Sequence, residues 1–214
     1  MLSLGLDTSG PACDVAVLQD ERCLAARRED MQRGQDARLA GLVSETCAAA
    51  GIALGQLDRI GIVTGPGSFT GIRVGLAFAR GLALATPADC VGVTSLEAAL
   101  PAGTQGSAIV ILPAQRRPPG ITYWAQRFRS GAATGAAEEI ALGDLADELR
   151  AHPRRVYGDG QALADALGDL VITPAAPSAE RAGRLAQRFD PALHLPRPNY
   201  ARAPDAALPG GARP

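Results

Sequence analysis

Apolar and polar residues alternate near the start of the chain in the manner of strands. This alternation predicts three successive strands, over residues 2–7, 13–18 and 22–28. An amphipathic helix is predicted next, over residues 36–50, because Leu, Val, Thr and Cys side chains recur there on one stripe. Asp36 is expected to be the N-cap of this helix.

The stretch Thr64–Pro87 combines a glycine-rich turn with a helix that carries almost no charge. Gly65 and Gly67 allow the chain to reverse sharply after an apolar strand, and Ser68 or Thr70 is expected to cap the helix that follows. Because this helix is apolar on nearly all sides, we expect a sheet beneath it and another helix above it.

The order of the predicted elements defines two lobes. Residues 1–100 alternate strands and helices after an initial run of strands, which predicts a mixed sheet covered by helices. Residues 101–190 predict a smaller α/β lobe, and residues 191–214 a tail rich in proline and glycine. The fold class is therefore α/β, with mixed sheets flanked by helices. Strands of the second lobe are expected at 107–112, 121–129, 155–157 and 170–172, and helices at 144–151, 161–167 and 178–189.

Small residues recur at every fourth position of the apolar helix. They are Gly71, Gly75, Ala79 and Ala83. Such a row forms a smooth groove that another backbone can approach closely. The groove is compatible with core packing inside one subunit and equally with contact to a second chain. Only Arg73 and Arg80 interrupt the apolar surface of this helix.

Glycine in a strand-to-helix turn invites comparison with phosphate-binding loops. A Walker A loop needs lysine, and the chain has none, so all 21 of its positive side chains are arginine. The dinucleotide pattern G-x-G-x-x-G fails because Thr70 occupies the place of the third glycine. A structural turn is therefore favoured over a direct phosphate contact for Gly65, Gly67 and Ser68.

Asp7, Thr8 and Ser9 end the first predicted strand and place an acid beside two hydroxyl groups. Such a group can contact a metal ion or a nucleotide phosphate, but an Asx or Ser turn needs the same residues, and we favour the turn. His152 and His194 lie far apart without metal-ligand spacing, so no metal site is predicted. No set of nucleophile, base and orienting group is visible, so no catalytic residue is predicted.

The composition is that of an ordinary globular protein. Hydrophobic residues make up 47% of the 214 residues, enough for a substantial core. A net charge of -1 provides no basic surface for nucleic acid, and 4% aromatic residues leave few stacking platforms. The four cysteines form no C-x-x-C pair and no apolar run reaches the length of a membrane span. We therefore expect reduced thiols, a cytoplasmic location and no membrane contact.

Five segments of the chain together match the pattern of a known family. The specific segments are LGLDTSGPACDVAVL at 4–18, GPGSFTGIRVGLAFARGLALA at 65–85 and VGVTSLEAAL at 91–100, and the weaker ones are ITYWAQRF at 121–128 and PNYAR at 198–202. Through these segments the chain resembles the TsaB family, also called YeaZ. The resemblance implies a two-lobed fold of the actin, Hsp70 and sugar-kinase type, which is ribonuclease H-like. This fold agrees with the predicted order of elements.

The resemblance also implies a function. Proteins similar to this chain help to install threonylcarbamoyl on N6 of the adenosine beside the anticodon, in tRNAs that read codons beginning with A, but they do not perform the transfer. A TsaD-like catalytic paralogue carries the metal and the active site, and a TsaE-like ATPase joins the assembly. The chain would then be a homodimer in isolation, would meet tRNA through the complex, and would need ATP, ADP or metal only through its partner subunits.

The two helices of the first lobe are the expected contact surface. A leucine and valine stripe on helix 36–50 and the small-residue row on helix 71–85 are expected to pack against a partner as a four-helix contact. We expect the homodimer and the mixed dimer with the TsaD-like subunit to share this surface. The residues expected at the interface are Leu39, Leu42, Val43, Arg73, Gly75, Leu76, Ala79, Arg80 and Ala83.

The sequence departs from the family pattern at two places and leaves rival functions open. Residues 34–39 lack the histidine that relatives often carry, and residues 112–116 lack the acid of the relatives' Ile-Asp-Ala-Arg loop. One rival is a small ATPase or kinase of the same fold, with the glycines of residues 158–160 as its second phosphate motif. The others are an M22-type peptidase, suggested by a glycoprotease label in the wider superfamily, and a dimeric scaffold unrelated to tRNA.

Overall fold

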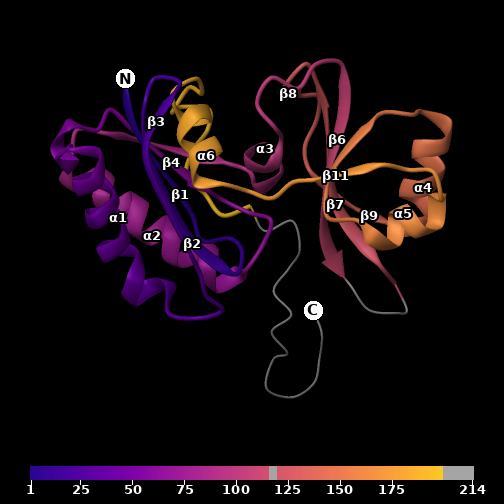
Figure 1. Ribbon diagram of the computed structural model, residues 1–214, viewed down its shortest axis with the longest axis horizontal. Helices are drawn as coiled ribbons and strands as arrows, with labels where there is room; N and C mark the ends of the chain where they lie inside the picture. The colour runs from indigo at the N-terminus through magenta and orange to yellow at the C-terminus, as the bar shows by residue number, and fades with distance from the viewer. Residues whose placement is uncertain (116–119, 200–214) are drawn as a thin grey trace.

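The computed structural model describes residues 1–115 and 120–199, which form two lobes side by side (Figure 1). Each lobe contains a sheet flanked by helices, as the order of predicted elements indicates. Two sequence segments discussed above fall partly outside the described residues. They are Arg116 of the segment 112–116, which differs from the family pattern, and residues 200–202 of the PNYAR segment.

Five strands form the first sheet in the order β3-β2-β1-β4-β5. Strands β1, β2 and β3 pair antiparallel, whereas β4 and β5 continue the sheet parallel to β1. Parallel strands need a crossover, and the helices before and after β4 provide it. The predicted mixed sheet is confirmed. Its strands are β1 (Leu2–Asp7), β2 (Ala12–Gln19), β3 (Arg22–Asp30), β4 (Arg59–Val63) and β5 (Asp89–Val93).

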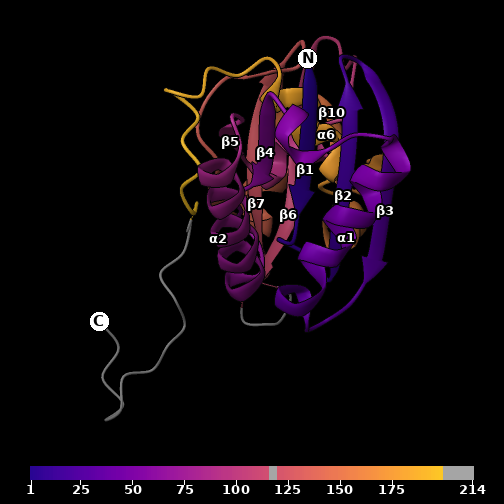
Figure 2. The same cartoon turned by 90° about the vertical axis from the view of Figure 1, so that its left-hand side faces the viewer.

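Helices α1 (Gln35–Ala50) and α2 (Phe69–Ala85) lie side by side over one face of the first sheet (Figure 2). The prediction that Asp36 caps α1 is wrong. Gly34 occupies the N-cap with a φ of 92°, and no side chain accepts a hydrogen bond there. Asp36 lies in the first turn, where its negative charge interacts favourably with the helix dipole and stabilises the helix. Gly51 ends the helix with a φ of 70°.

Helix α2 is buried on one side only. Ser68 is its N-cap, because the Ser68 Oγ accepts a hydrogen bond from the backbone N–H of Gly71 at 3.2 Å. Gly75 and Ala79 face the sheet, whereas Leu84 on the opposite side is 90% exposed. The expected helix above α2 is absent from the described residues. Helix α1 packs beside α2 instead, so the outer side of both helices is open.

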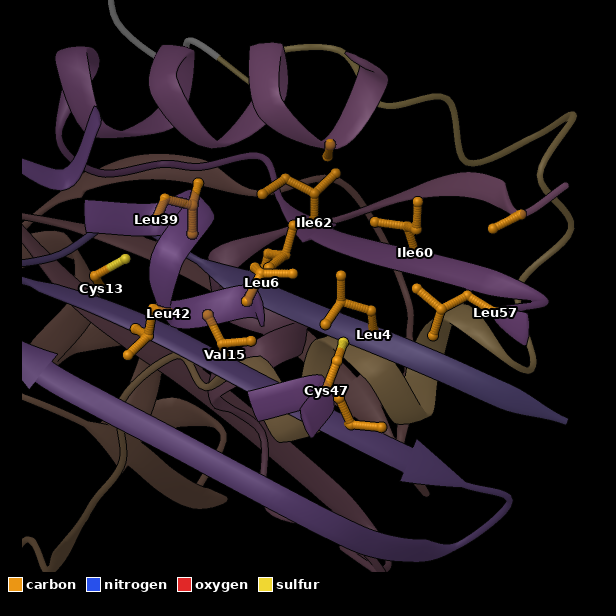
Figure 3. Packing of buried hydrophobic residues seen from close by; sticks show 14 of the residues in the cluster. Leu4, Leu6, Cys13, Val15, Leu39, Leu42, Cys47, Leu57, Ile60 and Ile62 are labelled. Atoms are coloured by element: carbon orange, nitrogen blue, oxygen red, sulfur yellow. The ribbon is translucent and has the colours of Figure 1, made fainter. Parts of the chain in front are cut away.

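The main core lies between the first sheet and these two helices (Figure 3). Leu6 and Ile62, on neighbouring strands, belong to one buried cluster with Leu39, Leu42 and Cys47 of α1, and each is at most 3% exposed. Burial of each such leucine or isoleucine side chain contributes about 1.5–3 kcal/mol. The apolar stripe predicted on this helix therefore holds it to the sheet of its own lobe.

The second sheet has the order β11-β10-β6-β7-β8, with β9 also paired to β7. Helices α4 (Leu142–Ala151) and α5 (Gln161–Leu167) belong to this lobe, and the short α3 (Ser95–Ala99) precedes it. Strands β8 and β9 were not among the predicted elements, because β8 is very short and β9 begins with two glutamates. The strands are β6 (Ser107–Gln115), β7 (Thr122–Arg129), β8 (Ala132–Ala133), β9 (Glu138–Ala141), β10 (Arg155–Gly158) and β11 (Ile172–Pro174).

The last helix, α6 (Ala179–Ala186), returns from the second lobe to the first sheet (Figure 1). It covers the sheet face opposite α1 and α2, with its backbone directly on β1 and β4. A Cβ atom at Gly5 would overlap the carbonyl oxygen of Ala179, and one at Gly61 would overlap that of Ala182. The predicted second lobe at 101–190 thus contains a helix that packs on the first lobe.

Candidate functional site

The six residues predicted as nucleotide or phosphate contacts lie together where two turns meet. The turn after β1 contributes Asp7, Thr8 and Ser9, and the turn before α2 contributes Gly65, Gly67 and Ser68. The Ser68 N–H donates a hydrogen bond to the Ser9 carbonyl at 2.7 Å. The Thr8 hydroxyl donates to the carbonyl of Gly71 at 2.7 Å. We call these two turns and their contacts the junction.

The side chains of the junction are already engaged within the chain. Asp7 is 5% exposed and its Oδ1 accepts a hydrogen bond from the Ser9 N–H at 2.8 Å. Burial raises the pKa of the Asp7 carboxyl. Thr8 and Ser9 are also buried, at 0% and 5% exposed. A carboxyl that is buried and bonded in this way forms the Asx turn favoured from the sequence.

The glycines of the junction are required by close backbone contact. A Cβ atom at Gly67 would overlap the Ser9 carbonyl oxygen, and a Cβ atom at Gly71 would overlap the Thr8 carbonyl oxygen. Gly65 has a φ of 107°, which side-chain-bearing residues rarely adopt. Packing and backbone geometry therefore account for these glycines without a ligand. Among the described residues, no three His, Cys, Asp or Glu side chains are grouped as metal ligands.

Asp14 is a buried acid beside the junction that the sequence reasoning missed. It pairs with Asp7 across β1 and β2, and its Oδ2 accepts a hydrogen bond from the Ala179 N–H at 2.9 Å. Arg28 stands 3.8 Å from the same oxygen. Burial is the main cause that raises the pKa of Asp14, and the neighbouring charge of Asp7 raises it further. The sequence feature that could have revealed Asp14 is its position as an acid inside the otherwise apolar strand β2.

Polar side chains connect the junction region to the second lobe. The Ser95 hydroxyl lies 3.5 Å from that of Ser9, and the Thr94 hydroxyl lies 3.4 Å from the Gln126 Oε1. Gln126 Nε2 in turn donates to the Gly135 carbonyl at 3.0 Å. The glycines of residues 158–160 instead border a separate hollow of about 730 Å³ near α5 and β11. None of these contacts joins the Asp7–Ser9 turn to the glycines of residues 158–160.

Most residues predicted at the subunit interface lie inside the subunit, so those assignments are wrong. The reason is that the most apolar stripe of each helix faces its own sheet. Arg73 and Arg80 are exposed and Ala83 is half-buried. The residues in the interior are Leu39, Leu42, Val43, Gly75, Leu76 and Ala79.

Helices α1 and α2 lie on the same side of the first sheet (Figure 2), and we call the exposed residues on their outer sides the helix face. On α1 the small side chains there lie beside the Arg38–Glu45 ion pair, since a Cβ atom at Gly41 would stand 2.8 Å from the Arg38 Nη1, and α2 adds two large apolar side chains. Phe69 is 37% exposed and the guanidinium carbon of Arg73 stands 3.9 Å from its ring centroid. Arg80 donates a 2.9 Å hydrogen bond to the Pro196 carbonyl. The helix face comprises Ala37, Ala40, Gly41, Ser44, Ala48, Phe69, Arg73, Ala77, Gly81 and Leu84.

Comparison with known proteins identifies the relatives of this chain. The family model for TsaD, tRNA N6-adenosine threonylcarbamoyltransferase, matches residues 29–198. The tRNA threonylcarbamoyladenosine biosynthesis protein TsaB of Escherichia coli is 33% identical over 145 residues, which is 66% of this chain and 62% of that protein. TsaB of Haemophilus influenzae is 38% identical over 96 residues, 44% of this chain and 40% of that protein. The matched segments thus span less than two thirds of either relative.

Solved structures extend the likeness over nearly the whole fold. An uncharacterised protein of Pseudomonas aeruginosa with similarity to peptidase YEAZ superposes with a TM-score of 0.73 at 25% identity, covering 94% of this chain and 99% of that one. The ROK hexokinase of Thermus thermophilus shares the fold alone, with a TM-score of 0.54 at 15% identity, covering 87% and 97%. No helix within the described residues combines the length and apolar character needed to cross a bilayer. The chain belongs to the TsaB (YeaZ) family and has the actin- and sugar-kinase-like fold.

Proposed function

We propose that this chain is a non-catalytic partner subunit in the biosynthesis of threonylcarbamoyladenosine in tRNA. In this proposal a TsaD-like paralogue transfers threonylcarbamoyl to N6 of the adenosine beside the anticodon, in tRNAs that read codons beginning with A. A TsaE-like ATPase joins them, and ATP, ADP or metal enters through these partners. The names of the relatives in Escherichia coli and Haemophilus influenzae place those proteins in this biosynthesis.

The state of the junction supports the absence of chemistry in this subunit. Asp7 is the acid best placed to hold a metal or phosphate, yet it is buried and its Oδ1 accepts the Ser9 N–H. A charged carboxylate that must leave these contacts to reach a ligand would lose hydrogen bonds that offset its desolvation. The rival kinase function requires that rearrangement, whereas a partner subunit does not.

The helix face is the observation that carries the proposal. Two neighbouring helices expose small side chains such as Ala40 and Ala77, with Leu84 90% exposed at one end. Small side chains let the helices of a second chain approach closely, and large apolar ones bury area on contact. We therefore place the contact with the TsaD-like subunit on the helix face, and the homodimer on the same surface. The two dimers would then exclude each other.

The proposal is tested by placing a charge on the helix face without disturbing the core. Ala77→Arg inserts a long cation at an exposed position of α2, and Ala166→Arg is the matched control at an exposed position of α5. Co-sedimentation of the purified chain with the TsaD-family protein of its own organism is expected to be lost with Ala77→Arg and kept with Ala166→Arg. Complex formation by both variants would refute the placement.

The biological role is measured separately from the contact. Depletion of the chain is expected to remove threonylcarbamoyladenosine from bulk tRNA, as measured by nucleoside mass spectrometry. Re-expression of the Ala166→Arg variant should restore the nucleoside, and re-expression of Ala77→Arg should not. Unchanged threonylcarbamoyladenosine after depletion would contradict the function and favour a scaffold unrelated to tRNA.

A further inference from the structure

Arg181 lies on the side of α6 that faces the second lobe, in the seam between the two lobes (Figure 1). Its Nε is buried and has no hydrogen-bond partner within residues 1–115 and 120–199. A buried guanidinium nitrogen without an acceptor loses water without replacing it, which costs free energy. The half-buried Arg181 side chain therefore carries one buried N–H donor that lacks an acceptor.

Carboxylates near Arg181 accept hydrogen bonds from Arg184 of the same helix and from Arg188 just beyond its end. Glu21 accepts hydrogen bonds from Arg184 at 2.9 Å and from Arg188 at 2.6 Å. Glu180 accepts from Arg184 at 2.7 Å. Neither acid is a hydrogen-bond partner of the Arg181 Nε.

Within the described part of the chain, Glu97 is the third acid that lines the hollows around Arg181, and it caps a helix. One of its oxygens accepts hydrogen bonds from the Thr94 N–H at 2.9 Å and from the Thr94 hydroxyl at 2.8 Å, which caps α3. Burial lowers the pKa of Arg181, and the charges of Arg188 and Arg184 lower it further. The charges of Glu21 and Glu97 raise the pKa of Arg181 and so partly oppose this lowering, which remains the net effect.

Three hollows meet at Arg181, with volumes of about 330, 460 and 220 Å³. The smallest combines the cation with apolar walls from Leu100, Phe128, Leu185 and Phe189. The ring of His194 stacks on Phe189 at 3.9 Å between centroids. This arrangement presents one charged donor group at the edge of an apolar, partly aromatic surface.

We propose that the seam is a binding site for a small organic carboxylate, with Arg181 as the residue that binds its anionic group. The planar guanidinium suits a carboxylate because it can donate two parallel hydrogen bonds. The apolar part of the ligand lies against Leu100, Phe128 and Phe189. Ligand sites commonly combine apolar walls with a few polar groups, as this seam does. A bound ligand would contact α6 and the β7–β8 turn together and so connect the two lobes.

This inference is independent of the proposed function and is tested on the purified full chain. Benzoate is titrated at constant ionic strength while the arginine ¹⁵Nε–¹Hε resonances are followed by NMR. Arg181→Gln removes the charge, and Arg155→Gln removes an exposed charge outside the three hollows as the control. The expected result is a saturable shift of the Arg181 signal, an affinity lowered about tenfold or more by Arg181→Gln, and no change with Arg155→Gln.

Several results would overturn the site. They are the absence of a saturable shift, an equal affinity in Arg181→Gln, or similar shifts of all exposed arginines. Binding of inorganic phosphate as tight as that of benzoate would refute the organic carboxylate, because the apolar walls would then contribute nothing. Thermal unfolding gives an independent readout: Arg181→Met is expected to raise the midpoint of the ligand-free protein. A lowered midpoint would reveal an internal partner for Arg181 and refute the unpaired N–H donor.

Discussion

The same substitution at two positions of α2 is expected to have opposite effects on stability. Gly75 faces the sheet, where a Cβ atom would overlap the Thr8 hydroxyl and stand 2.9 Å from the Ile62 Cδ1. Gly81 faces outward, and a Cβ atom there meets nothing within 4 Å. Gly75→Ala and Gly81→Ala therefore make the same chemical change in one helix, once against the core and once against solvent.

The magnitudes follow from three contributions. Alanine favours a helix interior over glycine by about 0.8–1.0 kcal/mol, and this gain applies at both positions. At Gly75, overpacking costs about 1–3 kcal/mol, and displacement of the buried hydrogen bond from Thr8 to Gly71 costs about 0.5–1.5 kcal/mol more. The net result is a loss of about 0.5–3.7 kcal/mol for Gly75→Ala and a gain of about 0.8–1.0 kcal/mol for Gly81→Ala.

Thermal unfolding followed by circular dichroism measures both changes. For a domain of this size each kcal/mol moves the midpoint by roughly 2–4 °C, so the two variants should separate on opposite sides of the parent protein. A Gly75→Ala variant as stable as Gly81→Ala would refute the placement of the small-residue row against the sheet. The same result would reopen the assignment of that row to a subunit interface.

Two further predictions concern buried ionisable groups. Burial raises the pKa of Asp7, so the stability it contributes is present below the unfolded pKa of about 3.9 and is lost as pH rises through the folded value. Asp7→Asn is therefore expected to raise the unfolding midpoint at about pH 7 and to have less effect near pH 4; a lower midpoint at both pH values would contradict this. Burial raises the pKa of both Cys13 and Cys90 to about 11, so Ellman's reagent should label them slowly in native protein and fast in urea. Fast labelling of native Cys13 would show that β2 is open.

The strands and helices of the first lobe could be predicted because local signals agree with the tertiary structure. Alternation over residues 2–7 predicts β1, and Thr94 with Glu97 predicts the capping box that begins α3. The return of α6 to the first sheet could not be predicted in this way. It depends on Gly5 and Gly61, whose missing Cβ atoms become meaningful only when a helix lies on them. A long-range contact of this kind leaves no periodic trace in the sequence.

In the candidate site, too, local features could be predicted from the sequence and long-range contacts could not. The sequence brings out Asp7, Thr8 and Ser9 as a unit and favours a turn for them, and the structure bears this out through the Asp7–Ser9 hydrogen bond. The interface prediction failed because an apolar stripe indicates burial without indicating what it is buried against. Leu39 and Leu42 pack against the sheet of their own lobe. A contact surface for a second chain therefore has to be sought on the opposite, less hydrophobic side of the helix.

Helix α2 joins the two conclusions that concern function. Its inner side touches the turn after β1 so closely that glycine is needed at Gly71 and Gly75, and this contact closes the junction around Asp7. Because the inner side is fixed by these backbone contacts, α2 cannot rotate or shift to expose its buried stripe without opening the junction. The outer side, with Ala77 and Leu84, is therefore held in one orientation by the same packing that buries the acid. A rigid surface of this kind loses little conformational entropy when a partner binds, which favours a docking role for the subunit.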